Sequence, residues 1–263
     1  MALKSFDELI AEAESQSFEG WDFAYLRRRL VESPTPWDYQ RIVTELLPGV
    51  DSLVDLGTGG GELLASLRSL PRRTFATEGY PPNVLVAKRR LQPIGVEVVE
   101  TQCDDNNKQT QSGALPFKDA SMDLVIDRHE SFIASEVFRV LKPSGRFVTQ
   151  QVGGSNYPEL NAALGVTESP TWRPWDLREA VEQIERAGFM VTDSREARLE
   201  ARFLDVGAVV YYLIAVPWQI PGFSTKGYNG KLHELDQAIR RDGSFRVTFS
   251  RFLVQAIKTP SLG

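Results

Sequence analysis

A carboxylate and a run of glycines stand together in the stretch VDLGTGGGELLASL, residues 54–67. An apolar run ends at Asp55, and four glycines follow within six residues: Gly57, Gly59, Gly60 and Gly61. Glycine reaches positive φ at no steric cost and lets the backbone approach a ligand closely. A helical pattern begins near Glu62, and the free N–H groups of a helix N-terminus suit an anionic or polar ligand. The pattern predicts a nucleotide-type site at the carboxyl end of a parallel strand.

The spacing of the glycines narrows the choice of nucleotide. The dinucleotide fingerprint G-x-G-x-x-G needs a third glycine at position 62, where this chain has Glu62. No Gly-Lys-Ser or Gly-Lys-Thr follows, so the P-loop pattern fails as well. The pattern that fits is Asp-x-Gly-x-Gly-x-Gly, which begins at Asp55.

A second carboxylate ends the next predicted strand, in TFATEGY. Glu78 lies 78 − 55 = 23 positions after Asp55. A carboxylate at that place can accept hydrogen bonds from both hydroxyls of a ribose. The alternative is a solvated acid at a strand end. Tyr80, just beyond, could pack on the face of an adenine.

These features resemble the class I S-adenosylmethionine-dependent methyltransferases, of the UbiE-like type. Three later stretches extend the resemblance over residues 52–152: VEVVETQCDDN, ALPFKDASMDLVIDRHE and VLKPSGRFVTQQVG. The last of them resembles a Leu-Lys-Pro-Gly-Gly turn and the strand after it. Ser144 stands in place of the first glycine of that turn, a departure from the family pattern.

The resemblance implies S-adenosyl-L-methionine as the cofactor and S-adenosyl-L-homocysteine as its product. Asp55 is then expected to favour the ammonium group of the cofactor. The family places an aspartate after the third strand to bind the adenine amino group. Asp104 fits that place best, and Asp105 is the alternative because the insertion NNKQTQSG makes the register uncertain. The implied cofactor-binding residues are Asp55, Gly57, Thr58, Gly59, Gly61, Glu78, Gly79, Tyr80, Asp104, Asp105 and Arg128.

The residues after the predicted fourth strand read IDRHES, beside the expected place of the transferred methyl group. The ordinary pKa of a histidine lies near neutrality, which makes His129 the candidate catalytic base. The alternative is that His129 only packs around the cofactor. Glu130 is the second catalytic candidate, since it could orient His129 or bind an acceptor amine. Arg128 could instead pair with a substrate carboxylate, with Asp127 or with Asp123.

The acceptor is expected to be a small molecule, methylated on an O or N atom. The Asn/Asp-Pro-Pro-Tyr/Phe tetrapeptide typical of base methyltransferases is absent after the fourth strand, and so is a basic patch with interleaved aromatics. Aromatic and amide side chains in the flanking segments are typical of small-ligand pockets. The candidate substrate-binding residues are Trp21, Tyr25, Gln151, Trp175, Tyr211 and Trp218.

Strand-like and helical runs alternate from residue 52 onward, which predicts βαβ units. We expect one α/β domain over 1–263, with a Rossmann-like, seven-stranded, mostly parallel sheet whose last strand is antiparallel. Helices should cover both faces. Residues 1–48 should form a helical cap that includes the run YLRRRLVES, 50–152 the cofactor-binding half, and 153–263 the substrate-side half with an insertion at 200–243. The final run, SFRVTFSRFLVQAIK, should be antiparallel at a sheet edge.

The composition of the chain limits which other functions and partners are possible. The chain has 263 residues, a net charge of −5, one cysteine and two histidines. These counts exclude an intrachain disulfide and argue against a zinc site, nonspecific nucleic-acid binding and an anionic membrane partner. The N-terminus lacks a signal-peptide pattern, and the apolar stretch 206–218 is too short for a bilayer. We therefore expect a cytoplasmic monomer or homodimer. The alternatives are a ribosomal-RNA or other nucleic-acid base methyltransferase and a non-catalytic cofactor-binding partner subunit.

Overall fold

The computed structural model describes residues 4–18, 23–101, 114–166 and 175–259. One sheet of eight strands runs in the order β1-β7-β8-β6-β5-β2-β3-β4. Its strands are β1 (Leu30–Glu32), β2 (Ser52–Leu56), β3 (Arg73–Glu78), β4 (Glu97–Glu100), β5 (Met122–Arg128), β6 (Leu141–Val152), β7 (Phe189–Phe203) and β8 (Phe245–Lys258). Strands β4, β3, β2, β5 and β6 are mutually parallel, whereas β8 is antiparallel to both β6 and β7. The mostly parallel α/β sheet is confirmed.

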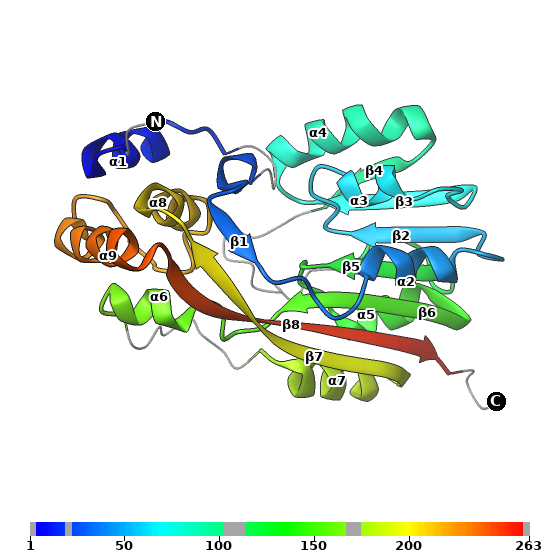
Figure 1. Cartoon of the computed structure of the whole chain (residues 1–263). Coiled ribbons are helices and arrows are strands. Elements are labelled where there is room, and N and C mark those ends of the chain that lie inside the picture. The colour runs from blue at the N-terminus through cyan, green and yellow to red at the C-terminus, as the bar shows by residue number, and fades with distance from the viewer. Residues whose placement is uncertain (1–3, 19–22, 102–113, 167–174, 260–263) are drawn as a thin grey trace.

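Helices flank both faces of the sheet (Figure 1). The α-helices are α1 (Phe6–Glu14), α2 (Tyr39–Leu46), α3 (Glu62–Ser66), α4 (Pro81–Leu91), α5 (Ala134–Val140), α6 (Pro158–Ala163), α7 (Leu177–Arg186), α8 (Val206–Ala215) and α9 (Asn229–Asp242). Two short 3-10 helices, η1 (Ala24–Leu26) and η2 (Gln92–Ile94), complete the described elements. Among these, no helix is both long and apolar enough to cross a membrane.

Hydrophobic side chains of the strands contribute to core clusters on both faces of the sheet. Leu53 of β2 packs in a cluster with α2, α3 and α4, whereas its neighbour Val54 packs in a cluster with α5 and α7. Successive side chains of a strand point to opposite faces, so one strand contributes to both clusters. A third cluster joins α1, α6, α8 and α9 to the ends of β7 and β8. The carboxyl ends of the parallel strands therefore face these cap helices (Figure 1).

Two sequence-based predictions of strand number and position are wrong. The sheet has eight strands instead of seven, because Leu30–Glu32, predicted to be helical, pairs with β7. Helix η1 ends at Leu26, and Arg28, with a φ of 63°, lies in the turn that leads into that strand. The final strand β8 lies between β6 and β7, not at a sheet edge. The cap at 1–48 therefore contributes a strand as well as helices.

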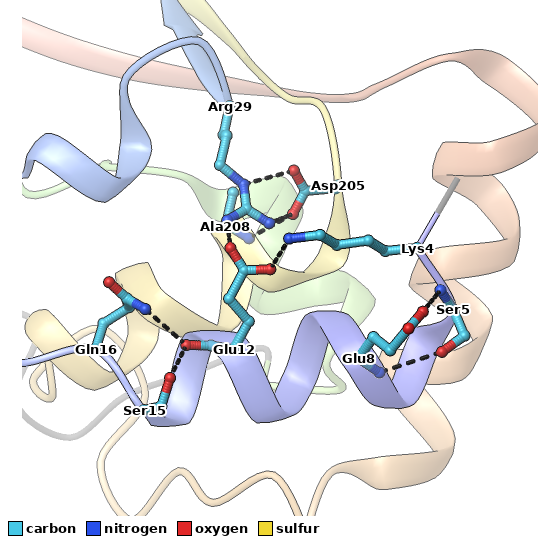
Figure 2. A network of polar contacts seen from close by, with 9 residues as sticks. All are labelled: Lys4, Ser5, Glu8, Glu12, Ser15, Gln16, Arg29, Asp205 and Ala208. Carbon is cyan, nitrogen blue, oxygen red and sulfur yellow. Dashed lines mark hydrogen bonds and ion pairs between the residues drawn. The ribbon is translucent and has the colours of Figure 1, made fainter. Parts of the chain in front are cut away.

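Capping side chains fix where the cap helices begin. Ser5 and Glu8 form the capping box of α1, and Asp205 accepts a hydrogen bond from the Ala208 N–H at the start of α8. Asp205 also accepts from Arg29, whose Nη1 lies 3.4 Å from Glu12 of α1 (Figure 2). The two helices and the chain before β1 are thus joined by one polar network.

Candidate functional site

The glycine turn between β2 and α3 has the backbone that its sequence predicts. Gly57, Gly59 and Gly61 have φ values of 57°, 62° and 80°, all in the left-handed region that favours glycine. Helix α3 begins at Glu62 but runs for only five residues. A Cβ on Gly57 would overlap the side chain of Glu130, so this glycine is required by space as well as by φ.

Asp55 lies one residue before the end of β2, beside this turn, and its side chain is buried. It forms no ion pair within the described part of the chain. Burial raises the pKa of Asp55 to about 7, the charge of Arg128 opposes the shift, and that of Glu78 adds to it. A carboxylate held in this way is stabilised by any cation that reaches it.

Glu78 ends β3, the strand that pairs with β2 on one side. Its Oε2 accepts from the Gly59 N–H at 2.7 Å, and its Oε1 accepts from the N–H groups of Gly79 and Tyr80 at 2.9 and 2.8 Å. Burial raises the pKa of Glu78, and the three N–H groups oppose that shift. Glu78 thus connects the glycine turn to the turn that begins α4. Its side chain is buried, so the alternative prediction of a solvated acid at the strand end is wrong.

The start of α4 adds polar and aromatic groups to the same edge. Tyr80 precedes the helix and its side chain is exposed. Asn83, in the first turn, is buried close to Glu78, and its Oδ1 has no hydrogen-bond partner in the structure as described. A buried acceptor without a donor carries a free-energy cost of about 1–3 kcal/mol, which a bound donor would remove.

Asp127, near the end of β5, is a site residue whose role the sequence did not reveal. It is fully buried; Oδ1 accepts from the Glu130 N–H and Oδ2 from Gln151 Nε2, both at 3.1 Å. Burial raises its pKa, and the charge of Glu130 adds to the shift. The signal available in the sequence was an aspartate inside an apolar strand, which needs buried donors. Asp127 therefore shapes the turn that carries His129.

His129 follows β5 in a left-handed conformation, with a φ of 72°. Its backbone N–H donates to the Gln150 carbonyl at 2.8 Å, and its Nε2 lies 3.0 Å from Gln150 Nε2. Although part of its surface reaches solvent, the surrounding protein and the charges of Arg251 and Arg128 lower the pKa of His129. His129 is therefore neutral at physiological pH.

Arg128 does not pair with either expected aspartate in the described structure. Asp123 instead binds Lys142 at 2.8 Å and accepts from Ser52, while Asp127 is occupied by neutral donors. Arg128 is exposed, and its charge acts on Asp55 and His129. Glu130 packs over Gly57, and burial raises its pKa. Of the two predicted catalytic residues, Glu130 therefore lies against the glycine turn, whereas His129 contacts Gln150 of β6.

The predicted substrate-binding residues are dispersed. Gln151 is buried, and its Nε2 donates to Asp127, to the Glu130 carbonyl and to Thr149, so its amide nitrogen is used within the protein. Tyr211 is buried in the cap cluster, with the ring of Tyr25 at 4.8 Å.

Trp175 is partly buried, and its ring lies 6.1 Å from that of Phe132. Trp218 is exposed beyond α8. Three predicted site residues lie outside the described residues: Trp21, Asp104 and Asp105.

Residues 54–149 match the sequence model of a family described as a methyltransferase domain. A relative in Desulfotalea psychrophila, the ubiquinone/menaquinone biosynthesis C-methyltransferase UbiE, is 36% identical over 111 residues, which cover 38% of this chain. That match spans 41% of the relative's length.

Solved structures share the fold. A protein of Bacillus halodurans described as a candidate methyltransferase has a TM-score of 0.56 at 16% identity, with 84% of this chain and 97% of that chain covered. A functionally unknown protein of Deinococcus radiodurans has a TM-score of 0.55 at 14% identity, with coverages of 90% and 98%. Identities this low show a common fold and nothing finer.

Proposed function

Residues 54–149 form a methyltransferase domain, and on that premise we propose that the chain transfers a methyl group from S-adenosyl-L-methionine to an O or N atom of a small molecule. One arrangement carries the proposal. Two buried carboxylates, Asp55 and Glu78, end neighbouring parallel strands on either side of a turn with three positive-φ glycines. No such arrangement is needed for the fold alone, because burying acids is costly.

The residues present fit this cofactor. Its ammonium would be held by Asp55, which is buried and forms no ion pair among the described residues. Its ribose hydroxyls would be held by Glu78, a buried carboxylate at the end of β3 whose Oε2 accepts from the Gly59 N–H of the glycine turn. The unpartnered Asn83 Oδ1 lies beside this place. Tyr80 would offer its ring to the adenine.

The bound cofactor supplies an electrophilic methyl group on a sulfonium. The task left to the protein is to align an acceptor with it and to exclude water, which together lower the barrier by several kcal/mol. His129 and Glu130 follow β5, where Glu130 packs over Gly57, and they are the residues proposed to contact the acceptor. The aromatic residues Tyr25, Trp175 and Trp218 are proposed to line its binding place.

Carbon is the second candidate for the acceptor atom. The Desulfotalea relative, 36% identical over 111 residues, is a C-methyltransferase. The acid-rich surroundings of the glycine turn and the net charge of −5 favour a small molecule over RNA, since phosphates would be repelled.

The test uses S-adenosylmethionine with a ¹³C-labelled methyl group, incubated with the purified chain and, separately, with a small-metabolite extract or total RNA. We expect label in a small molecule, and the ¹³C chemical shift of the new methyl group will identify its O, N or C attachment. The Asp55→Asn variant is the matched control and should transfer no label. Label only in RNA would overturn the small-molecule proposal, and no label with intact cofactor binding would indicate a non-catalytic partner subunit.

A further inference from the structure

Three polar side chains form a line from the protein interior to the site. Trp37 Nε1 donates to Gln150 Oε1 at 2.7 Å, and Gln150 Nε2 lies 3.0 Å from His129 Nε2. Trp37 and Gln150 are 6% and 7% exposed, so the bond between them is shielded from water, whereas His129 at the end of the line is exposed. Trp37 lies just before α2 and Gln150 is in β6, so elements distant in sequence meet at His129.

The chemistry of these groups permits only one arrangement of protons. An indole N–H is a donor and never an acceptor, so the Gln150 oxygen must face Trp37 and its NH₂ group must face His129. The NH₂ group can only donate, and therefore His129 Nε2 must accept. A neutral imidazole has one donor and one acceptor nitrogen, which leaves its proton on Nδ1.

We infer that Trp37 and Gln150 hold His129 as the neutral Nδ1–H tautomer, so that His129 acts on the methyl acceptor as a hydrogen-bond donor and not as a base. The second part of this inference rests on the proposed function; the first part does not. Trp37 and Gln150 are positioning residues here, because they act through His129. No hydrogen bond from His129 Nδ1 occurs among the described residues, so its N–H is available to a ligand.

Protonation of His129 would break the arrangement. An imidazolium has N–H groups on both nitrogens, so Nε2–H would point at the Gln150 NH₂ group, donor against donor. The charged groups that act on the ring, Arg128 of β5 and Arg251 of β8, also disfavour a positive charge there. The backbone adds a further restraint, because the His129 N–H is bonded to the Gln150 carbonyl at 2.8 Å.

Nuclear magnetic resonance of protein labelled with ¹⁵N in histidine tests the tautomer directly. The chain has only His129 and His233, and the His233→Gln variant assigns the signals; His233 is exposed and stacks on Phe6. We expect the Nδ1–H pattern for His129, with no titration between about pH 5 and 8. The Nε2–H pattern, or titration in that range, would overturn the inference.

Two variants test the positioning role. In Gln150→Glu a carboxylate, which only accepts, faces both Trp37 and His129, so His129 should switch to Nε2–H and its pKa should rise into the titrating range. In Trp37→Phe the amide loses its orienting donor, so both tautomers should appear. An unchanged Nδ1–H signal in both variants would show that these residues do not set the tautomer.

Cofactor titration of the same samples separates this inference from the proposed function. Both variants should bind S-adenosylmethionine within about threefold of the wild-type affinity, because neither residue is among those proposed to hold the cofactor. A wrong tautomer in a wild-type protein that binds the cofactor contradicts only the inference about His129. The expected tautomer in a protein that binds no cofactor contradicts only the proposed function.

Discussion

Arg29 donates from Nε and Nη2 to the two carboxylate oxygens of Asp205, at 2.8 and 2.7 Å, in a bidentate pair (Figure 2). Asp205 at the same time caps α8, through the Ala208 N–H at 2.9 Å. Both side chains are largely buried, with 18% and 23% of their surfaces exposed. One carboxylate thus fastens the chain before β1 to the start of the most buried cap helix, α8.

This double role predicts an order of stability for two substitutions. Asp205→Asn keeps an oxygen for the helix cap but loses the ion pair, so the free energy of unfolding should fall by about 1–2 kcal/mol. Asp205→Ala loses both and leaves Arg29 unpaired, which should cost about 2–4 kcal/mol. Urea denaturation measures both values. Equal losses in the two variants would show that only one of the two interactions contributes.

Gly57 and Gly49 form a matched pair for testing the glycine turn. Both have positive φ, but a Cβ on Gly57 would overlap Glu130, whereas one on Gly49 would meet nothing within 4 Å. Backbone strain from alanine should cost about 1–2 kcal/mol of stability at either place, and Gly57→Ala should lose more because its Cβ must displace Glu130. Only Gly57→Ala should also weaken S-adenosylmethionine binding, by at least tenfold or about 1.4 kcal/mol. Calorimetric titration checks this, and comparable affinities in the two variants would contradict it.

The raised pKa of Asp55 predicts that cofactor binding releases protons. In the free protein burial raises this pKa to about 7, so the carboxyl is partly protonated near neutral pH. A bound ammonium favours the ionised form and lowers the pKa, so a proton leaves on binding at about pH 6.5 but not at about pH 8.5. Affinity should accordingly fall as the pH drops below about 7.

Calorimetry in buffers of different ionisation enthalpy measures the proton release. The apparent binding enthalpy should depend on the buffer at about pH 6.5 and become independent of it at about pH 8.5. Asp55→Asn is the control, because Glu78, Asp127 and Glu130 also have raised pKa values. The same buffer dependence in that variant would assign the proton to one of these other groups.

Ser144 is strained by the turn it occupies. Its φ is 64°, in the left-handed region, and the residue is exposed between α5 and the main part of β6. Glycine at this position removes the steric clash of the Cβ atom. Glycine also loses more conformational entropy on folding, but this cost is smaller than the strain that is relieved. Ser144→Gly should therefore raise the free energy of unfolding by roughly 0.5–1 kcal/mol in thermal or urea denaturation. A loss of stability would mean that the serine side chain contributes more than the strain costs.

The parts of the fold that could be predicted from sequence are those set by local chemistry. The glycine turn requires positive φ, so the spacing of Gly57, Gly59 and Gly61 predicted both its conformation and the helix start at Glu62. The position of Glu78 at the end of a strand next to that turn was predicted as well, whereas the sequence left open whether its side chain is solvated, and the structure shows it buried.

The features that escaped prediction depend on partners far away in the sequence. Leu30–Glu32 has a helical pattern but pairs with β7, some 170 residues later, where ladder bonds outweigh local propensity. Gln150 is one of two adjacent glutamines, and the sequence does not show how its amide is oriented. That orientation is set by hydrogen bonds to two distant residues, Trp37 and His129. Arg29 lies in the run YLRRRLVES, and nothing near it in sequence indicates its partner Asp205.

Isothermal titration of the purified chain with S-adenosylmethionine and with S-adenosylhomocysteine is the most direct test of the central claim that Asp55, Glu78 and the glycine turn hold this cofactor. We predict micromolar binding of both, at about −8 kcal/mol. We also predict a loss of about 1–3 kcal/mol of that binding in Glu78→Ala. Binding of neither compound by a folded wild-type chain, or undiminished binding by Glu78→Ala, would contradict it.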